Sequence, residues 1–83
     1  MYNATVIIKL KKGVLNPEGR TVLRALNHLG YDGVKDAKTF KCVELTLEGD
    51  NENEVYNKVD DMCKKLLANP VIHDYEITLK KIE

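Results

Sequence analysis

The side chains best suited to ligand binding are few, and two of them form a pair. Arg20 and Arg24 are the only arginines and lie four residues apart. On a helix this spacing places both on one face, where guanidinium groups can hold a carboxylate or a phosphate through paired hydrogen bonds. The pair has three interpretations: a solvated helix face, which is the ordinary one, an anchor for a protein partner, or an anion site.

The histidines and cysteines have no spacing that indicates a metal or redox site. His28 and His73 are far apart, without the HxxxH or Cys-His spacing that zinc requires. Cys42 and Cys63 form no CxxC motif, and one pair does not make the disulfide framework of a small secreted protein. We therefore expect two structural or surface histidines and two reduced, buried thiols.

The sequence also lacks the motifs that cradle phosphates or pair carboxylates. Each of the five glycines sits at a predicted element boundary, and neither GxGxxG nor GxxxxGK[ST] can be written through them. Asp60 and Asp61 are neighbours on a predicted helix, where side chains point about 100° apart, so they cannot share a proton. We therefore expect no catalytic residue, no metal and no cofactor in this chain.

Composition indicates a single globular domain over residues 1–83. The chain is 43% hydrophobic and 31% charged, close to the average of soluble domains. No apolar run approaches the ~20 residues that span a bilayer, and the N-terminus does not resemble a signal peptide, so the expected location is the cytoplasm. Thirteen basic and thirteen acidic residues cancel, which argues against a nucleic-acid partner.

The charges are nevertheless segregated along the chain. Residues 44–61 hold seven acids and one base, Lys58, a net charge of −6, so the remainder carries +6. This segment is either a solvated strand end and helix start or a docking surface for a partner of opposite charge.

Apolar periodicity predicts five elements in the order strand, helix, long strand, helix, strand. The predicted strands cover residues 2–10, 34–48 and 71–82, the middle one bent or bulged because its centre has no tight-turn residues. Asn16 and Pro17 open the first helix, which Gly30 ends, and Asn51 caps the second, which Asn69-Pro70 ends. The apolar stripe of the second helix is predicted at Val55, Val59, Met62, Leu66 and Leu67.

This order predicts an α+β fold with a small antiparallel or mixed sheet of three to four strands and two helices on one face. The second sheet face would then expose Ile7, Phe40 and Ile72, and the outer strands would leave unpaired edges. Pairing across a two-fold axis covers both, so we expect a homodimer or a higher oligomer, dimerising through the sheet.

Other small α+β families can be compared with these residues. An acylphosphatase-like enzyme needs an arginine in the loop after the first strand, and this loop has none before Arg20. An RNA-recognition sheet needs aromatic platforms and positive charge, which the chain lacks. A stand-alone, small-molecule-sensing regulatory dimer of the ACT kind remains an alternative, because such domains bind effectors with few motif residues.

Three segments resemble one family specifically: GVLNPEGRTVLRAL at 13–26, KDAKTFKCVELTLE at 35–48, and CKKLLANPVIHDYEI at 63–77. Together they are similar, essentially end to end, to the PurS-type small subunit of phosphoribosylformylglycinamidine synthase, also called formylglycinamide ribonucleotide amidotransferase. The family pattern Val-x-x-Pro-x-Gly is matched by Val14, Pro17 and Gly19. A second pattern, Leu-Leu-Ala-Asn-x-Val-Ile-x-Asp-Tyr, is matched between Leu66 and Tyr75. One departure is Phe40 before Lys41, where the family usually has glycine.

The resemblance implies a non-catalytic assembly subunit of de novo purine biosynthesis. In this family a glutaminase subunit releases ammonia, and a large synthetase subunit uses ATP and Mg to convert formylglycinamide ribonucleotide to the amidine. The small subunit, as a dimer, bridges them and assists ammonia transfer. The chain alone is then expected to have no activity, although it belongs to an ATP-dependent carbon–nitrogen ligase with glutamine as nitrogen donor.

The resemblance also suggests which residues contact the larger subunits. The two loops that carry the family motifs hold more polar residues than a cap or a turn needs. The candidate partner-interface residues are Asn16, Pro17, Gly19, Arg20, Asn69, Pro70, Asp74 and Tyr75.

Overall fold

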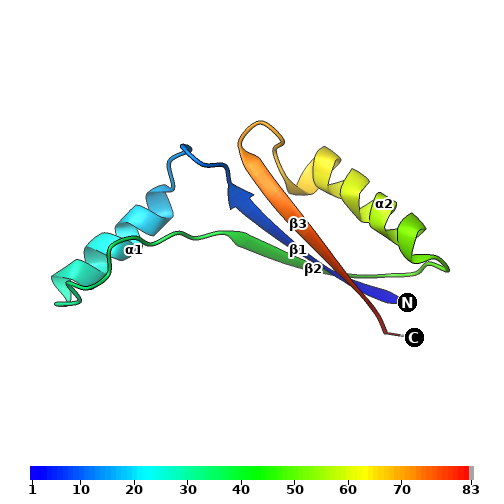
Figure 1. Ribbon diagram of the computed structural model, residues 1–83, viewed down its shortest axis with the longest axis horizontal. Helices are drawn as coiled ribbons and strands as arrows, with labels where there is room; N and C mark the ends of the chain where they lie inside the picture. The colour runs from blue at the N-terminus through cyan, green and yellow to red at the C-terminus, as the bar shows by residue number, and fades with distance from the viewer. Residues whose placement is uncertain (83) are drawn as a thin grey trace.

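The computed structural model describes residues 1–82 and has the predicted order of elements. It contains strand β1 (Tyr2–Leu10), helix α1 (Pro17–His28), strand β2 (Lys41–Leu47), helix α2 (Glu52–Met62), a π-helical turn η1 (Cys63–Leu67) and strand β3 (His73–Lys81) (Figure 1). The strands form an antiparallel sheet in the order β2-β1-β3. The predicted α+β class is therefore confirmed, with three strands.

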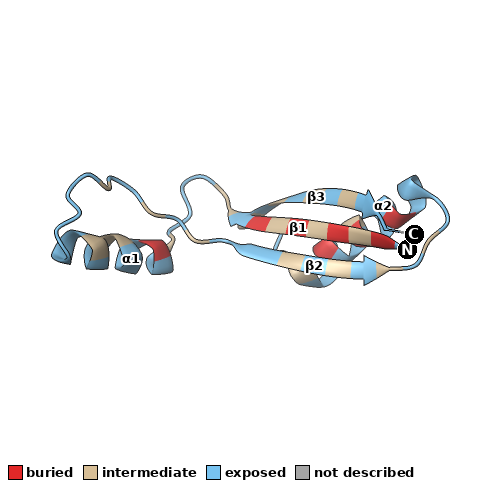
Figure 2. Cartoon of the chain, turned by 90° about the horizontal axis from the view of Figure 1, so that it is seen from below, coloured by how far each residue is buried: buried red, intermediate tan, exposed pale blue. Residues whose placement is uncertain are grey.

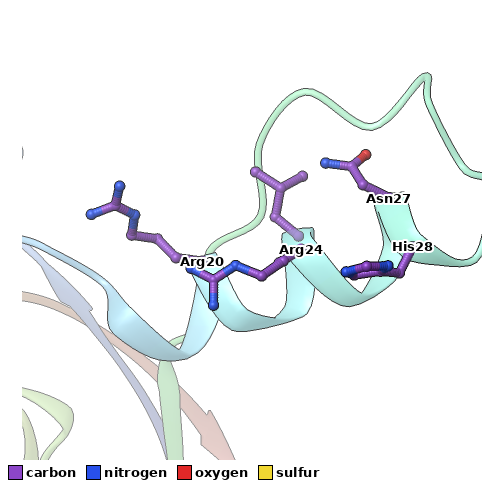
Figure 3. Close-up of a pocket in the computed structure, with 5 residues that line it drawn as sticks. Arg20, Arg24, Asn27 and His28 are labelled. Carbon is purple, nitrogen blue, oxygen red and sulfur yellow. The ribbon is translucent and has the colours of Figure 1, made fainter.

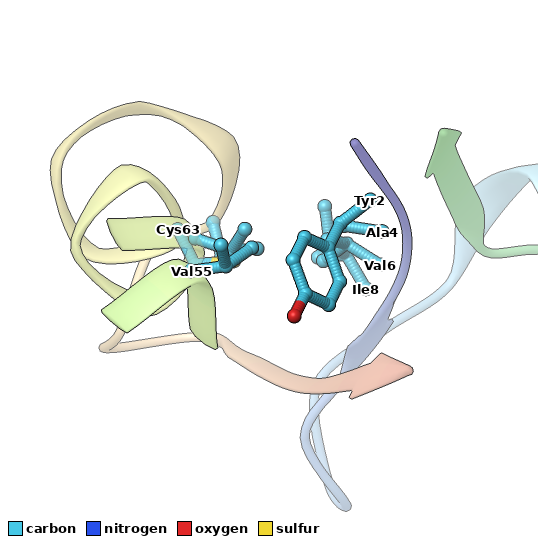
Figure 4. Packing of buried hydrophobic residues seen from close by; sticks show 8 residues of the cluster. Tyr2, Ala4, Val6, Ile8, Val55 and Cys63 are labelled. Carbon is cyan, nitrogen blue, oxygen red and sulfur yellow. The ribbon is translucent and has the colours of Figure 1, made fainter. Parts of the chain in front are cut away.

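Strand β1 is the centre of the sheet, and its alternation decides which face is buried. Tyr2, Ala4, Val6 and Ile8 are all buried and face α2. Figure 4 shows them pointing from β1 toward Val55 and Cys63 of the helical segment. Their partners across the sheet, such as Val43 opposite Val6 on one side and Ile77 on the other, are half-buried on the same face. The core is thus one sheet face under one helix.

The stripe by which α2 packs on the sheet differs from the predicted one. Val55, Val59 and Cys63 are fully buried, whereas Met62 and Leu66 are exposed. Residues four apart keep nearly the same helical face. After Cys63 the helix widens, because the Ala68 N–H donates to the carbonyl of Cys63, five residues back, at 2.9 Å. This π-turn brings Ala68 back to the core and leaves Leu66 outside.

The predicted long strand over residues 34–48 is paired only in its second half. Residues 34–40 run extended without a strand partner, and β2 begins at Lys41, opposite Ile8. The physical reason is that β1 ends at Leu10, so the earlier residues have no neighbouring strand. The final strand likewise begins at His73 rather than residue 71, because Ile72 and His73 donate their N–H groups to the carbonyl of Asn69 in a turn.

Helix α1 does not lie on the sheet, which corrects the predicted placement of both helices on one face. The helix and the segment that runs back from it form an arm, residues 11–40, that extends beyond the end of the sheet (Figure 1). Figure 2 shows buried residues concentrated in β1 and in the α2 segment, while α1 has a single buried residue, Gly19, in its first turn. The chain measures 51 × 28 × 15 Å as a result.

The sheet face away from α2 is mainly polar. The prediction that this second face exposes Ile7, Phe40 and Ile72 together is therefore wrong. Ile7 is half-buried there beside Cys42 and Glu76, and the Asn3 amide donates to the Glu44 carboxylate at 3.1 Å. Phe40 is exposed, but it lies in the arm, and Ile72 lies in the turn before β3. Several strongly exposed apolar side chains lie in two other places: Leu15, Leu29 and Tyr31 on the arm, and Leu66 and Val71 after α2.

Candidate partner interface

The candidate interface residues lie in and directly after two loops at one end of the sheet, the later ones being in the first turn of α1 and at the start of β3. The first loop opens α1 at Asn16, and the second enters β3 after Asn69. Leu10 is opposite His73 in the register, and the Lys11 N–H donates to the carbonyl of Ile72 at 2.8 Å. The structure therefore brings the neighbourhoods of both loops together, although they are some fifty residues apart in the sequence.

Asn16 joins the two halves of the arm. Its Oδ1 accepts from the Gly19 N–H at 2.9 Å, which makes it the predicted N-cap, and from the Thr39 hydroxyl at 3.1 Å. Its Nδ2 donates to the Thr39 carbonyl at 2.8 Å. One half-buried amide thus starts α1 and fixes the returning segment. Thr39 has no motif in the sequence, so local patterns did not identify it as the partner of Asn16.

Gly19 is needed where α1 comes close to the returning segment of the arm. A Cβ at this position would overlap the carbonyl oxygen of Ala37, and Asn16 Oδ1 would lie 3.1 Å from it. The helix can approach the returning segment only because residue 19 has no side chain. Pro17, at the first helical position, is exposed, as is Arg20.

Arg20 and Arg24 form a cationic row along α1. A shallow recess of about 460 Å³ is lined by Arg20, Leu23, Arg24, Asn27 and His28. Figure 3 shows the labelled side chains of Arg20, Arg24, Asn27 and His28, all of which come from this one helix. Neither arginine takes part in an ion pair among residues 1–82. This row can contact carboxylates of another protein, since guanidinium groups are common anchors at interfaces.

Asn69 builds the second loop. Its Oδ1 accepts from the Val71 N–H at 3.0 Å, and its own N–H donates to Nδ1 of His73 at 2.9 Å. With Pro70 following, these bonds stop the helical segment and turn the chain into β3. His73, which the sequence left as structural or on the surface, closes this turn. Val71 at the tip is 79% exposed.

Tyr75 and Asp74 point to opposite faces of β3. The Tyr75 hydroxyl donates to the Asp60 carboxylate of α2 at 2.6 Å. This hydrogen bond, followed by the one from Lys64, holds the pKa of Asp60 below its ordinary value of 3.8. The same bond and burial raise the pKa of Tyr75 to about 12. Asp60 therefore fixes α2 to β3, while Asp74 is exposed.

The described part of the chain holds no cluster of metal-ligating side chains, and its two cysteines lie apart. Among residues 1–82, no group of three His, Cys, Asp or Glu side chains could hold a metal ion. Cys63 is buried as expected, and burial raises the pKa of its thiol. Cys42 is exposed, which corrects the expectation of two buried thiols: it lies on the polar sheet face, away from Cys63.

No helix in residues 1–82 is both long and apolar enough to cross a membrane.

The side chains of the candidate interface are arginines, amides and one tyrosine–carboxylate pair, arranged around two turns. Such groups can bind another surface, and they do not form a nucleophile–base pair.

Comparison with known proteins identifies the family. The family model named PurS, described as phosphoribosylformylglycinamidine (FGAM) synthase, matches residues 3–81. The PurS subunit of this synthase from Methanocaldococcus jannaschii is 66% identical over 83 residues, which cover all of both chains.

Solved structures agree with the sequence comparison. The M. jannaschii PurS crystal structure has a TM-score of 0.91 and 65% identity, with full coverage of both chains. A chain of the structure of PurLQS from Thermotoga maritima has a TM-score of 0.84 and 28% identity, covering 96% of this chain and 99% of that one. The chain therefore belongs to the PurS family, the family of the PurS subunit of phosphoribosylformylglycinamidine synthase in purine biosynthesis.

Proposed function

We propose that this chain is a non-catalytic assembly subunit of phosphoribosylformylglycinamidine synthase. It bridges the glutaminase subunit and the ATP-dependent synthetase subunit in the cytoplasm and assists the passage of ammonia between them. ATP and Mg act in the synthetase subunit. The observation that carries this proposal is the arm, which extends beyond the sheet (Figure 1) and bears exposed apolar and cationic side chains.

The relatives support a role in a complex. A related chain of the same fold comes from a structure named PurLQS. A bridge also has a chemical purpose, because ammonia in water near pH 7 is mostly protonated and is then no nucleophile. Shielded passage keeps it reactive.

The test measures amidine formation by purified synthetase and glutaminase subunits, with and without this chain. Glutamine and then ammonium salt serve as nitrogen donors. We expect the chain to be required with glutamine and dispensable at high ammonium. Equal rates with and without the chain, using glutamine, would overturn the proposal.

The residues that contact the larger subunits are those the fold itself does not use. Asn16, Gly19 and Tyr75 make internal contacts, whereas Arg20 and Asp74 are exposed. We expect Arg20→Ala with Asp74→Ala to weaken binding to the partner subunits by at least about tenfold. Glu76→Ala with Lys80→Ala, which also removes one acid and one base, is the control, because both side chains are exposed on β3 and lie outside the two loops and outside residues 44–61. Equal weakening by both pairs would place the interface elsewhere.

The chain also pairs with a second copy, through the arm and the sheet of its partner. Residues 11–40 contain six basic and three acidic residues, a net charge of +3, and lie at the opposite end of the molecule from the start of α2 (Figure 1). Residues 44–61 carry −6. A two-fold axis can place each arm near the acidic segment of the other copy, and opposite charges of this kind orient protein partners.

Sedimentation of paired variants tests this homodimer. Leu15 and Leu29 are 68% and 74% exposed on the arm, and Leu66 and Val71 are 82% and 79% exposed after α2. Leu15→Ser with Leu29→Ser is expected to raise the dimer dissociation constant at least about tenfold, because apolar contacts are lost. Leu66→Ser with Val71→Ser is the matched control. A monomeric natural chain, or loss of the dimer in the control alone, would overturn this pairing.

A further inference from the structure

A second recess lies where the arm leaves the sheet, apart from the arginine row of α1. It has a volume of about 300 Å³, and we name it the lysine recess because Lys9, Lys11, Lys12 and Lys38 all line it. Phe40 and Asn16 complete its wall, and none of the described residues that line it is acidic. Four lysines therefore contribute to the lining of one recess.

Hydrogen bonds hold the walls of the recess in place. The amide of Asn16 bonds both the carbonyl and the hydroxyl of Thr39, so the two sides of the arm are joined at the recess. The Val14 N–H donates to the carbonyl of Lys11 at 3.0 Å, closing a turn in which Gly13 has φ +90°. The Lys11 N–H bonds the carbonyl of Ile72 in the turn before β3. A recess with fixed walls binds a ligand with little ordering cost.

The positive charge of the recess is only slightly neutralised within the chain. Lys38 lies 3.8 Å from Asp36, and both side chains are largely exposed, so this pair is weak. The Lys9 ammonium lies over the Phe40 ring, 5.0 Å from its centre, which positions the charge without cancelling it. Lys11 and Lys12 take part in no ion pair among residues 1–82. A concave wall focuses the field of such groups on an anion.

We propose that the lysine recess binds the phosphoryl groups of a small phosphorylated compound. Ammonium groups hold phosphate as point charges, and a phosphoryl group carries enough negative charge and acceptor oxygens to satisfy several of them at once. A volume of about 300 Å³ is at the lower end of small-ligand sites and suits one or two phosphoryl groups. This ligand site adds to the assembly role and does not depend on it.

Calorimetric titration of the whole chain with inorganic pyrophosphate, at constant ionic strength, tests the site. Lys11→Gln with Lys12→Gln is expected to raise the dissociation constant at least about tenfold, because charge-assisted hydrogen bonds are lost. Lys80→Gln with Lys81→Gln removes the same charge from the end of β3 and is expected to change it less than about threefold. Equal weakening by both variants would mean general attraction to a cationic protein and would overturn the site.

Amide chemical shifts of the natural chain give a second measurement that does not depend on variant folding. Pyrophosphate is expected to shift residues 9–14 and 38–40 and to leave α2 unchanged. Shifts along α1 or spread over all lysines would overturn the proposal. So would binding of hexaglutamate without binding of pyrophosphate, since the recess would then accept an acidic protein segment. Because only this chain is present, the result is independent of whether it couples the two enzyme subunits.

Discussion

At the scale of single residues, asparagine side chains form two helix caps and one turn. Asn16 and Asn51 each accept backbone N–H groups at the start of a helix, and Asn69 builds the turn before β3. An amide can accept and donate at once, so it suits positions where two chain segments meet. Asn16 does this most completely, because it bonds both α1 and Thr39.

Replacing Asn16 with alanine should therefore cost more than the loss of a helix cap. A cap contributes about 1 kcal/mol, and the bonds to Thr39 add a similar amount, so we expect the free energy of unfolding to fall by about 2 kcal/mol. Urea unfolding at fixed protein concentration measures it. Asn27→Ala, on the exposed surface of the same helix, is the control and should change stability by less than about 0.5 kcal/mol. A loss no larger than that of the control would show that the Thr39 bonds do not stabilise the arm.

The hydrogen bond between Tyr75 and Asp60 makes a pH-dependent contribution. The pKa of Asp60 is lowered in the folded state, so its contribution is present above pH 3.8 and is lost as the pH falls through the lowered value. The pKa of Tyr75 is raised from 10.0 to about 12, so its contribution is present below pH 10 and is lost as the pH rises through about 12.

In Tyr75→Phe we expect the pKa of Asp60 to rise toward its ordinary value while Lys64 still lowers it. Carboxyl titration by NMR measures this shift. The stability difference between natural chain and variant should be largest near neutral pH and should shrink in acid and in strong alkali. Tyr56→Phe, at an exposed tyrosine of α2, is the control. An unchanged pKa of Asp60 in Tyr75→Phe would mean that the hydrogen bond is absent in solution.

At the scale of elements, the arm is held by close backbone contact rather than by a large core. Helix α1 touches its returning segment where Gly19 meets Ala37, and the main buried cluster lies elsewhere, between β1 and the α2 segment (Figure 2). The arm should therefore be sensitive to added volume at this one contact.

Gly19→Ala is expected to lower the free energy of unfolding by about 1–3 kcal/mol, because the new Cβ overlaps the Ala37 carbonyl. Thermal or urea unfolding measures the loss. Gly33→Ala is the matched glycine control: no atom lies within 4 Å of a Cβ there, so alanine should be neutral or slightly stabilising. If both variants were equally stable, the narrow approach of the arm would not exist in solution.

At the scale of the whole molecule, the single chain is more extended than a compact domain of its length. Its radius of gyration is 16.5 Å, whereas a compact chain of 83 residues has about 12 Å. The arm bears a net +3 and residues 44–61 a net −6, so the elongated shape also separates charge. Both features favour association with other chains.

The charge separation predicts that self-association responds to salt. Electrostatic steering acts mainly on the rate of encounter, and the screening length falls from about 10 Å at 0.1 M salt to about 3 Å at 1 M. We expect the association rate constant to fall at least about tenfold over this range, with little change in the dissociation rate. Stopped-flow mixing of labelled chains measures both. An association rate constant that does not change with salt would show that charge complementarity does not drive self-association.

The sequence alone determined the features that depend on neighbouring residues. Strand β1 has the predicted bounds, Asn16 and Asn51 are the predicted caps, and the family follows from motifs within short segments. Alternation, capping and turn formation act over one to four residues, so a local pattern is sufficient to predict them.

Only the tertiary structure decided where the elements lie relative to one another. The bonds of Asn16 to Thr39 span 23 positions, and that of Tyr75 to Asp60 spans 15. The same holds for the position of α1 beyond the sheet, the burial of Cys63 in place of Met62, and the lysine recess. These features depend on contacts between segments that are distant in the sequence. The arm in addition exposes apolar side chains that no other part of the described chain covers. No local period encodes such contacts, since they arise only when the segments pack.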